Sequence, residues 1–422
     1  MTVSRVVELE GHIIDSGMMQ ACFGIVMDLD GQFDVEEFRV GRSKTEESYC
    51  RMTVLADDPA TLRSIVHELH QHGANPADPQ DAEVTAAPAD RVVPPGFYST
   101  TNHPTEVRYE GEWLPVERIE MDCAVVVHPA DEVGANAATD DGPQERPWAE
   151  TKVLNAVSEG DLVVTGETGI RVHPPERPRE KRAFGFMQGG VSAERPSEST
   201  IAQIAEELQH VKDDGGDVLV VAGPAVIHTG AREALAELVR EGYVDMLSAG
   251  NGFAVHDLER DRYGTSLGMD TETLDHPRKG HKHHIYTISE VIRAGGIRAA
   301  VADGLVDSGV MYECIENDVD YVLAGSIRDD GPLPDTITDA VEAQNALREQ
   351  AHEADMVMML STLLHSVAVG NCLPSTTRVV CVDINPATVT QLLDRGSAQA
   401  VGMVTDVGTF LPTLADYVLT RS

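Results

Sequence analysis

The chain has 422 residues, of which 42% are hydrophobic, and this composition is sufficient for a large buried core organised in two or three domains. It carries 70 acidic and 32 basic residues, which gives a formal net charge of -38 at pH 7. Because the acidic residues are spread along the whole chain and repel phosphates, this charge excludes nucleic acid and disfavours anionic membrane surfaces as partners.

Only six of the 32 basic residues are lysines. Dense carboxylates with few lysines keep a protein hydrated at high salt, where the screening length falls to about 3 Å at 1 M. The N-terminal region lacks the basic and apolar segments of a secretion signal, and no apolar run approaches the ~18 residues of a membrane span. The sequence therefore predicts a cytoplasmic protein of a halophile.

The six cysteines form no CxxC pair and no regular framework, so neither a disulfide scaffold nor a zinc knuckle is expected. They are predicted to be reduced thiols. Cys314 is interpreted as a core residue, with a nucleophilic thiol as the alternative.

A small α+β module is predicted over residues 1–90. Apolar alternation marks strands at residues 6–14 and 38–40, and Pro59 begins a helix whose apolar residues recur at helical spacing. Residues 76–95 are rich in Ala, Pro and Asp and are predicted to form a linker or an exposed loop.

A β-rich, barrel-like segment is predicted over residues 91–195. Short alternating runs separated by turn residues are typical of a small barrel or sandwich. These runs lie at residues 107–109, 112–116, 123–127, 161–164 and 169–172. The acidic stretch 131–148 has no periodicity and is interpreted as a surface insertion.

Strands alternate with helices over residues 196–422. Buried-type strands are predicted at residues 217–222, 321–324, 356–360 and 379–382, each followed by a helical stretch. This alternation is typical of an α/β domain with a parallel, doubly wound sheet. Such sheets bind ligands outside the carboxyl ends of their strands.

Polar groups follow several of these predicted strands. Asp383 is placed to accept hydrogen bonds from a ribose, although Asn385 with Pro386 makes a helix N-cap an equally good interpretation. Residues 361–366 offer hydroxyls and amides to a phosphate, and Asp406 adds a second acid. The usual GxGxxG motif is absent, but three polar strand ends on one edge favour a cofactor cleft.

Two further kinds of loop are candidates for ligand contact. Residues 248–252 and 264–268 are glycine-rich and allow close backbone approach. The carboxylates of residues 329–335 follow another strand and suit ammonium recognition or a shared proton, with a charged turn as the alternative.

The segment 276–286 concentrates ionisable groups, with two of the six lysines and four of the sixteen histidines. A lysine such as Lys282, beside other cations in a partly desolvated pocket, loses its proton more readily and becomes a base or an imine former. A solvated basic loop is the alternative. A metal site is not predicted, because adjacent His283 and His284 diverge and no third ligand has regular spacing. Lys279 is interpreted as a surface charge.

Six motifs along the chain carry a resemblance to a known family. They are residues 8–17 (ELEGHIIDSG), 96–102 (GFYSTTN), 120–123 (EMDC), 223–230 (GPAVIHTG), 324–334 and 404–408. In number and order they resemble the archaeal-type ornithine cyclodeaminase family, which carries the domain named for lysine-oxoglutarate reductase/saccharopine dehydrogenase, here from a haloarchaeon-like source. Residues 282–285 (KHHI) also resemble the lysine motif of deoxyhypusine synthase, an NAD enzyme in which that lysine forms an imine with an amine substrate.

The resemblance implies a tightly held NAD in a Rossmann-like, deoxyhypusine-synthase-like domain. The family's NAD contacts fall on Asn251, Gly252, Asp330, Thr362, Leu363, Leu364, His365, Asp383, Ile384, Asn385, Asp406 and Val407. Two departures are Gly252, where we expect alanine in relatives, and the segment 361–364, which lacks the methionine that relatives tend to have before leucine.

The resemblance further implies conversion of L-ornithine to L-proline and ammonia, in proline biosynthesis and in arginine and ornithine catabolism. NAD would take hydride from Cα, the δ-amine would attack the resulting imine and release ammonia, and the same hydride would return, with no net redox. We predict Lys282 as base or imine former, tuned by His283 and His284, with Asp257 or Glu313 as ammonium partner.

Two alternatives stay open. One is an NAD-dependent amino acid dehydrogenase of the saccharopine or lysine type, which would accumulate NADH. The other is a non-enzymatic protein that senses NAD or an amino acid through its N-terminal module. A homo-oligomer, either dimer or tetramer, is also predicted, since cofactor clefts in this kind of fold are often completed by a neighbouring subunit.

Overall fold

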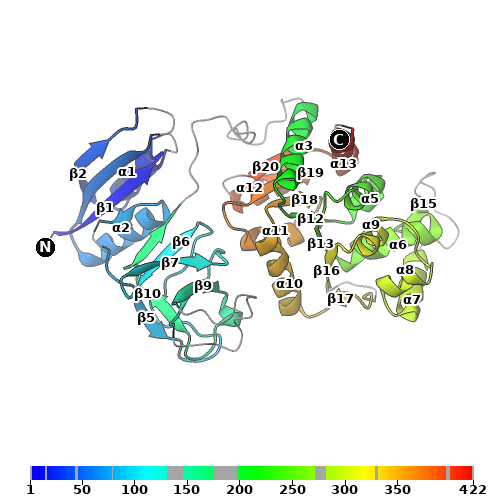
Figure 1. The fold of residues 1–422 in the computed structure, drawn as a ribbon, viewed down its shortest axis with the longest axis horizontal. Helices are drawn as coiled ribbons and strands as arrows, with labels where there is room; N and C mark the ends of the chain where they lie inside the picture. The colour runs from blue at the N-terminus through cyan, green and yellow to red at the C-terminus, as the bar shows by residue number, and fades with distance from the viewer. Residues whose placement is uncertain are drawn as a thin grey trace. The chain divides into compact units, whose positions relative to one another are not determined.

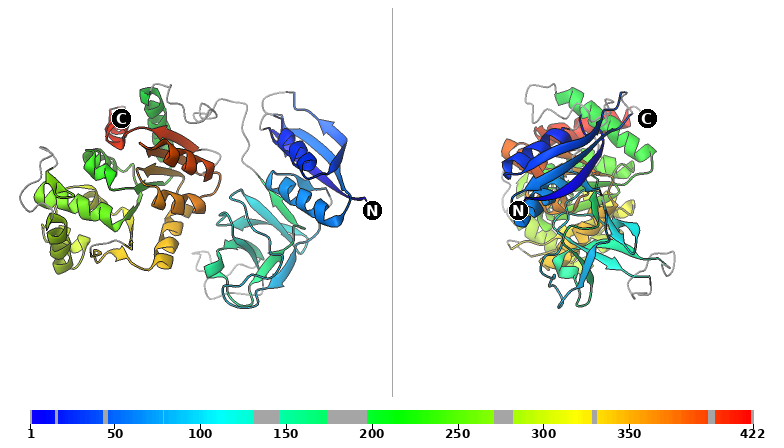
Figure 2. Two further views of the ribbon diagram at one scale, coloured as in Figure 1. Left: turned by 180° about the vertical axis from the view of Figure 1, so that it is seen from behind. Right: turned by 90° about the vertical axis from the view of Figure 1, so that its left-hand side faces the viewer.

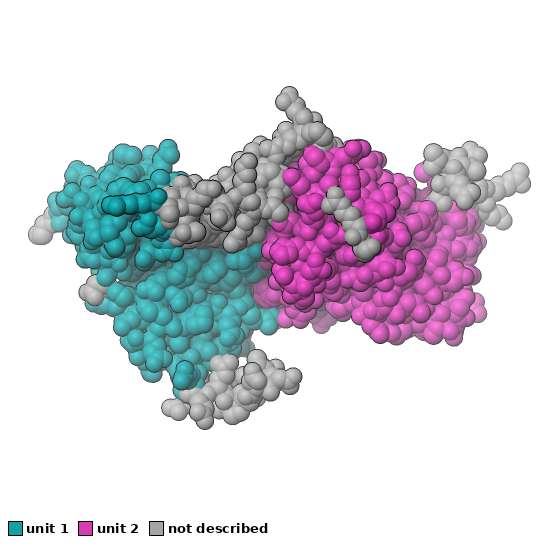
Figure 3. Space-filling view, turned by 45° about the horizontal axis from the view of Figure 1, so that its top comes forward, with its two compact units in different colours: residues 1–185, 374–376 teal, residues 186–373, 377–422 magenta. Residues whose placement is uncertain are grey.

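The computed structural model describes residues 2–14, 17–42, 46–77, 79–130, 146–173, 197–270, 282–327, 331–395 and 400–420. The chain divides into two compact units (Figure 3). Unit 1 comprises residues 1–185 and 374–376, and unit 2 comprises residues 186–373 and 377–422. No helix in the described ranges is both long and apolar enough to span a membrane.

Unit 1 begins with a small α+β module. Its elements are β1 (Val3–Gly11), α1 (Met18–Asp28), β2 (Gln32–Arg39), β3 (Ser48–Ala56), α2 (Pro59–Gln71) and β4 (Asn75–Pro76). The strands form an antiparallel sheet in the order β2-β3-β1-β4. Buried residues alternate along β3, as in a sheet with one face on a core. Asp58 begins α2 by accepting hydrogen bonds from the N–H groups of Ala60 (2.8 Å) and Thr61 (3.1 Å).

The second part of unit 1 is a seven-stranded sheet in the order β11-β6-β7-β9-β8-β10-β5. Its strands are β5 (Glu83–Ala86), β6 (Thr105–Tyr109), β7 (Glu112–Glu117), β8 (Ala124–His128), β9 (Trp148–Lys152), β10 (Leu162–Thr165) and β11 (Ile170–Val172). All pairs are antiparallel except β7 with β9. Ala82, just before β5, donates its N–H to the carbonyl of Arg108 on β6 (2.7 Å). This hydrogen bond joins the two ends of the strand order, which gives the sheet a barrel-like form.

Two details of unit 1 differ from the sequence analysis. Strand β5 lies before residue 90, yet it pairs with β10 in the second sheet and not with the first. Strand β9 begins at Trp148, the last residue of the stretch interpreted as an insertion. Its residues Trp148, Glu150 and Lys152 are only partly buried, so an apolar run does not mark the strand. Residues 131–145 lie outside the described ranges.

Unit 2 is built on a parallel sheet. Its strands are β12 (Val218–Ala222), β13 (Met246–Gly250), β16 (Asp320–Ala324), β17 (Thr336–Ile337), β18 (Met356–Leu360), β19 (Arg378–Asp383) and β20 (Ala400–Val404). They lie in the order β17-β16-β13-β12-β18-β19-β20, and every pair is parallel. Apart from β17 this is the Rossmann order 3-2-1-4-5-6, with its switch point between β12 and β18. The predicted parallel-sheet, Rossmann-like domain is confirmed.

Helices cover both faces of this sheet (Figures 1 and 2). One face carries α10 (Ala340–Glu353), α11 (Leu364–Cys372) and α12 (Pro386–Arg395). The other carries α3 (Ser197–Asp213), α5 (Arg232–Arg240) and α13 (Val407–Leu419), which pack against one another. The remaining described helices are α4 (Ala225–His228), α6 (Asn251–Tyr263), α7 (His283–Ala294), α8 (Ile297–Ala302) and α9 (Val310–Glu316).

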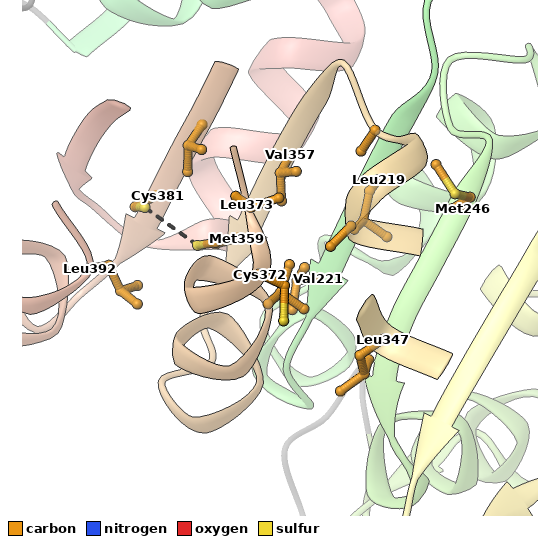
Figure 4. Close-up of a cluster of buried hydrophobic side chains, with 14 of the residues drawn as sticks. Leu219, Val221, Met246, Leu347, Val357, Met359, Cys372, Leu373, Cys381 and Leu392 are labelled. Carbon is orange, nitrogen blue, oxygen red and sulfur yellow. Dashed lines mark hydrogen bonds between the residues drawn. The ribbon is translucent and has the colours of Figure 1, made fainter. Parts of the chain in front are cut away.

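Side chains from the strands interlock with α10, α11 and α12 in one hydrophobic cluster (Figure 4). Leu219 and Val357 are fully buried in it, and the cluster includes Leu347 of α10. The thiol of Cys381 lies 3.7 Å from the sulfur of Met359, so even the polar atoms of this layer contact soft, apolar partners. This packing makes the sheet a rigid support for the residues at its carboxyl edge.

Candidate active site

The carboxyl ends of five parallel strands of unit 2 place a glycine and four polar residues along one edge of the sheet. These residues are Gly223 after β12, Asn251 after β13, Thr362 after β18, Asp383 at the end of β19 and Asp406 after β20. Since parallel strands present the same end to the same edge, the predicted strand-end groups are brought together here.

Two backbone segments lie close together at the switch point of the sheet. The N–H of Gly223 donates to the carbonyl of Leu360 (2.9 Å). A Cβ at residue 223 would lie 2.1 Å from the carbonyl oxygen of Ser361, so only glycine fits. Ser361 itself has a positive φ of 52°. The loops after β12 and β18 are therefore in direct contact, and both must keep this conformation.

Helix α11 begins directly at this edge. No side chain in the described residues caps its first turn, so its N–H groups are available to an anion. Leu363 and Leu364 are 42% and 75% exposed there. The His365 ring lies 3.0 Å from the position of a Cβ on Gly250, which ties α11 to the end of β13. The buried hydroxyl of Ser366 has no hydrogen-bond partner among the described residues.

Of the two candidates at this strand end, Asn385 takes the role of helix cap. Asn385 caps α12, because its side-chain oxygen accepts from the N–H of Ala387 (3.0 Å). Asp383 accepts from the N–H of Asn385 through Oδ1 (2.8 Å), and no described residue donates to its Oδ2. Ile384, between them, is 73% exposed. A carboxylate and an apolar side chain thus face solvent side by side.

At the next strand end Asp406 caps α13 by accepting from the N–H of Gly408 (2.7 Å), while Val407 is buried. A Cβ on Gly408 would lie 2.4 Å from the carbonyl oxygen of Thr229. The first turn of α13 therefore packs directly on the segment 223–230, one of the motifs quoted for the family resemblance.

Asn251 is a buried anchor at the end of β13. Its side-chain oxygen accepts from the N–H of Leu333 (3.0 Å) and from the hydroxyl of Thr336 (2.9 Å). It therefore holds the segment before β17 against the strand end. At Gly252 an added Cβ would meet no atom within 4 Å, so the alanine expected in relatives fits. Asp330 lies outside the described residues.

The lysine–histidine cluster is described from Lys282 onwards. Lys282 is exposed and immediately precedes α7, and His283 and His284 are the first residues of that helix, both half-buried. The His283 ring stacks on Tyr263 with a centroid separation of 4.7 Å and an interplanar angle of 17°. The partly desolvated pocket expected for Lys282 is thus not seen around its side chain in the described residues.

A fully buried carboxylate, Glu259 of α6, organises this region. It accepts from the N–H groups of Leu267 (3.2 Å) and Gly268 (2.9 Å), from the hydroxyl of Thr265 (2.8 Å) and from Nδ1 of His256 (3.0 Å). Burial alone raises the pKa of Glu259, but the hydrogen bonds from His256, Gly268 and Thr265 outweigh it and hold the pKa below its ordinary value. Glu259 is therefore an ionised group in the interior.

This carboxylate determines the tautomer of His283. The single hydroxyl proton of Thr265 is donated to Glu259, so the Thr265 oxygen is an acceptor for Nδ1 of His283 at 2.8 Å. His283 must then carry its proton on Nδ1, which leaves Nε2 with a lone pair when the ring is neutral. The arrangement orients a proton acceptor next to Lys282 in the chain.

A second histidine pair adjoins Glu259. The ring of His228, at the end of α4, lies 5.1 Å from that of His256, and its Nδ1 lies 2.6 Å from the hydroxyl of Ser266. Burial and then the neighbouring His256 lower the pKa of His228 to about 4, against a smaller opposing effect of Glu259. His228 is therefore a neutral ring at physiological pH.

His256 and Glu259 are not among the site residues predicted from the sequence. Their signal was a histidine and an acid three residues apart in a helix that also buries apolar residues, Phe253 and Leu258 among them. Such a pair on a buried face requires internal partners. The partner glycine-rich loop, residues 264–268, had been selected for backbone contact with a ligand; here it contacts Glu259 instead.

The two carboxylates predicted as ammonium partners already have partners of their own. Asp257 is fully buried, with Oδ1 2.6 Å from Nε of Arg232 and Oδ2 accepting from the N–H of Met311 (2.8 Å). Glu313 pairs with Arg240 at 2.5 Å. These contacts connect α6, α9 and α5, which indicates structural roles. Cys314, next to Glu313, is buried, and burial raises the pKa of its thiol, as expected for a core residue.

Three family models match successive parts of the chain. They are described as the LOR/SDH bifunctional enzyme conserved region (residues 4–103), the first region of the C-terminal part of arginine dihydrolase ArgZ-like proteins (residues 104–201) and the Rossmann fold of that C-terminal part (residues 202–414). The models divide the chain at residues 103 and 201, whereas the sequence analysis divided it at 90 and 195.

Individual relatives match over nearly the whole chain. The ornithine cyclodeaminase of Methanopyrus kandleri is 52% identical over 412 residues, which are 97% of this chain and 96% of that protein. The crystal structure of apo ArgZ, an arginine dihydrolase from cyanobacteria, matches with 40% identity and a TM-score of 0.82, and this chain covers 59% of it. A ternary complex of AgrE with ornithine and NAD+ matches with 41% identity and a TM-score of 0.53, again over 59% of that chain.

The buried neutral state of His228 predicts a pH dependence of stability. The unfolded chain takes up a proton near pH 6.5, whereas folded His228 does so only near pH 4. The free energy of unfolding should therefore be highest above pH 6.5 and fall towards pH 4. We expect this fall, measured by denaturant unfolding, to be less steep in His228→Gln. His210→Gln, which changes an exposed histidine of α3, should keep the wild-type slope. Equal slopes in wild type and His228→Gln would contradict the assignment.

Proposed function

Because the chain belongs to the ArgZ-like ornithine cyclodeaminase family, we propose that it is an NAD-dependent enzyme that converts L-ornithine into L-proline and ammonia. The observation that carries this proposal is the 52% identity to an ornithine cyclodeaminase over 97% of this chain and 96% of that protein. The AgrE complex with ornithine and NAD+ supports both ligands. Assembly as a dimer or tetramer, a cytoplasmic location and adaptation to high salt stay predictions.

The edge of the parallel sheet fits NAD. Gly223 leaves room where a Cβ would collide with the neighbouring loop, as a close backbone approach requires. The uncapped first turn of α11 suits a pyrophosphate, and Asp383 has an oxygen that suits a ribose hydroxyl. The exposed Leu364 and Ile384 supply apolar surface to planar rings. Asn251 and Asp406 would act mainly by holding the surrounding loops, with any NAD contact through neighbouring backbone.

NAD, when bound, supplies a two-electron acceptor for the α-carbon of ornithine and then returns the same electrons, so that no net redox occurs. The residues of the chain must then move protons and exclude water. We assign the base or imine-forming role to Lys282 and a proton-acceptor role to Nε2 of His283. Thr265 and Glu259 are positioning residues, since they fix the tautomer of His283.

Incubation of the full chain with L-ornithine in molar KCl tests the proposed reaction. We expect proline and ammonia in equal amounts, with no accumulation of NADH at 340 nm, because the electrons return to the substrate carbon. Accumulation of NADH in proportion to consumed ornithine would instead show a dehydrogenase. Ornithine or NAD binding without turnover would show a sensing protein.

Gly223→Ala tests the cofactor edge. The added methyl must displace the Ser361 carbonyl and so change the loops on both sides of the switch point, and we expect NAD binding to weaken by about tenfold or more. Titration of NAD into each protein measures the change. Gly24→Ala is the matched control, since a Cβ at residue 24 would meet no atom within 4 Å. Wild-type NAD affinity in Gly223→Ala would rule out an NAD site that depends on the close approach of Gly223 to Ser361.

Lys282→Ala tests the proposed base. Loss of a positioned proton-transfer group lowers turnover by about 10²- to 10⁴-fold. We expect kcat for proline formation to fall by this amount while NAD affinity is kept, because Lys282 precedes α7 and lies on none of the strand ends. Lys279→Ala, the neighbouring lysine of the same motif, should keep wild-type turnover. Wild-type kcat in Lys282→Ala with NAD bound would exclude the role.

A further inference from the structure

Unit 1 contains a cavity of about 530 Å³ that none of the assignments above uses. It lies between the start of β1, helix α2 and the loop of residues 166–168, which joins β10 to β11. All residues that line it belong to unit 1, whereas the strand ends proposed to hold NAD belong to unit 2. Cavities of about 300–1,000 Å³ hold ligands of metabolite size.

A buried histidine without partners lines this cavity. His70 of α2 is 4% exposed, and neither ring nitrogen has a hydrogen-bond partner among the described residues. Oε2 of Glu167 lies 3.9 Å from Nδ1 of His70, which is beyond hydrogen-bond distance. Burial lowers the pKa of His70 to about 4, so the ring is neutral and offers one donor and one acceptor. Buried polar atoms in this state are satisfied by a ligand or by water.

Two arginines add positive charge to the lining. Arg5 on β1 and Arg63 on α2 are exposed, and neither forms an ion pair within the described residues. In a chain with 70 acidic and 32 basic residues, two arginines in the lining of one cavity concentrate positive charge there. The guanidinium group matches a carboxylate through two parallel hydrogen bonds. The cavity therefore favours an anionic group of this shape.

The opposite charge is also present. Glu167 accepts from His67 through Oε1, with Nδ1 at 2.5 Å, and its Oε2 faces the His70 side. Burial raises the pKa of Glu167 even though His67 opposes the shift, so a further cation near Oε2 would favour the ionised form. The remaining wall is apolar, with Val7, Leu62 and Val66 in the lining.

We propose that this cavity binds a small α-amino acid with an apolar side chain. Arg5 and Arg63 receive its carboxylate, Glu167 receives its ammonium group, and the side chain packs on the apolar wall. The nitrogens of His70 gain the polar partner that they lack. The site is independent of the proposed ornithine reaction, since no residue of the strand-end edge takes part in it.

Calorimetric titration of the full chain with L-valine, L-leucine and L-proline tests the proposal. We expect at least one of them to bind saturably at one site per chain. Two fragments of valine separate the contributions of its charges. Removing the ammonium group (3-methylbutanoate) or the carboxylate (2-methylpropan-1-amine) should each weaken binding by about tenfold or more. The readout is binding, so a failure of ornithine turnover leaves the test intact.

Variants localise the site. Arg5→Gln, Arg63→Gln and His70→Leu should each weaken binding of the amino acid by about tenfold. Arg91→Gln is the matched control, because Arg91 is an exposed arginine of unit 1 that does not line the cavity. If His70→Leu does not fold, the two exposed arginines carry the test alone. The proposal is overturned if none of the three amino acids binds, if valine binds but no more tightly than its fragments, or if Arg5→Gln and Arg63→Gln bind the amino acid as the wild type does.

Discussion

The parallel pairing of all seven strands of the unit 2 sheet is the constraint on which the proposed active site depends. It brings the carboxyl ends of β12, β13, β18, β19 and β20 to one edge, although the residues there are up to 183 positions apart in the chain, from Gly223 to Asp406. The close approach of Gly223 to Ser361 shows how tightly the two halves of the sheet meet at the switch point. Both faces are covered by helices, so the edge is the part of the sheet left for a ligand.

A buried negative charge organises the neighbouring region. Glu259 remains ionised in the interior because four donors surround its carboxylate. Through Thr265 it also sets which nitrogen of His283 carries the proton. The same group that stabilises the loop 264–268 therefore prepares a proton acceptor beside Lys282. The Thr265 hydroxyl, which lies between Glu259 and His283, therefore links the buried carboxylate to the proposed proton acceptor.

Much of this arrangement could be predicted from the sequence, for physical reasons. Apolar strands such as 356–360, each followed by a polar residue and a helix, predict a parallel sheet and the position of its ligand edge. Asp383 and Asn385 could not be separated as ligand group and helix cap, since both types of residue suit both roles. Glu259 was missed because the sequence does not show that the loop 264–268, which follows the helix, folds back to donate hydrogen bonds to its carboxylate. The burial of His70 and the absence of a hydrogen-bond partner for its ring among the described residues result from the packing around α2. A single histidine in a helical sequence does not indicate either property.

Transfer of isotope from L-ornithine deuterated at C2 tests the central claim, that the chain catalyses a closed, redox-neutral conversion, most directly. If the electrons removed from the α-carbon return to the same carbon, proline formed in ordinary water should retain deuterium at C2. The location of the label is read by mass spectrometry and by NMR of the product. Proline that contains hydrogen from solvent at C2, or deuterium recovered in accumulated NADH, would contradict the account.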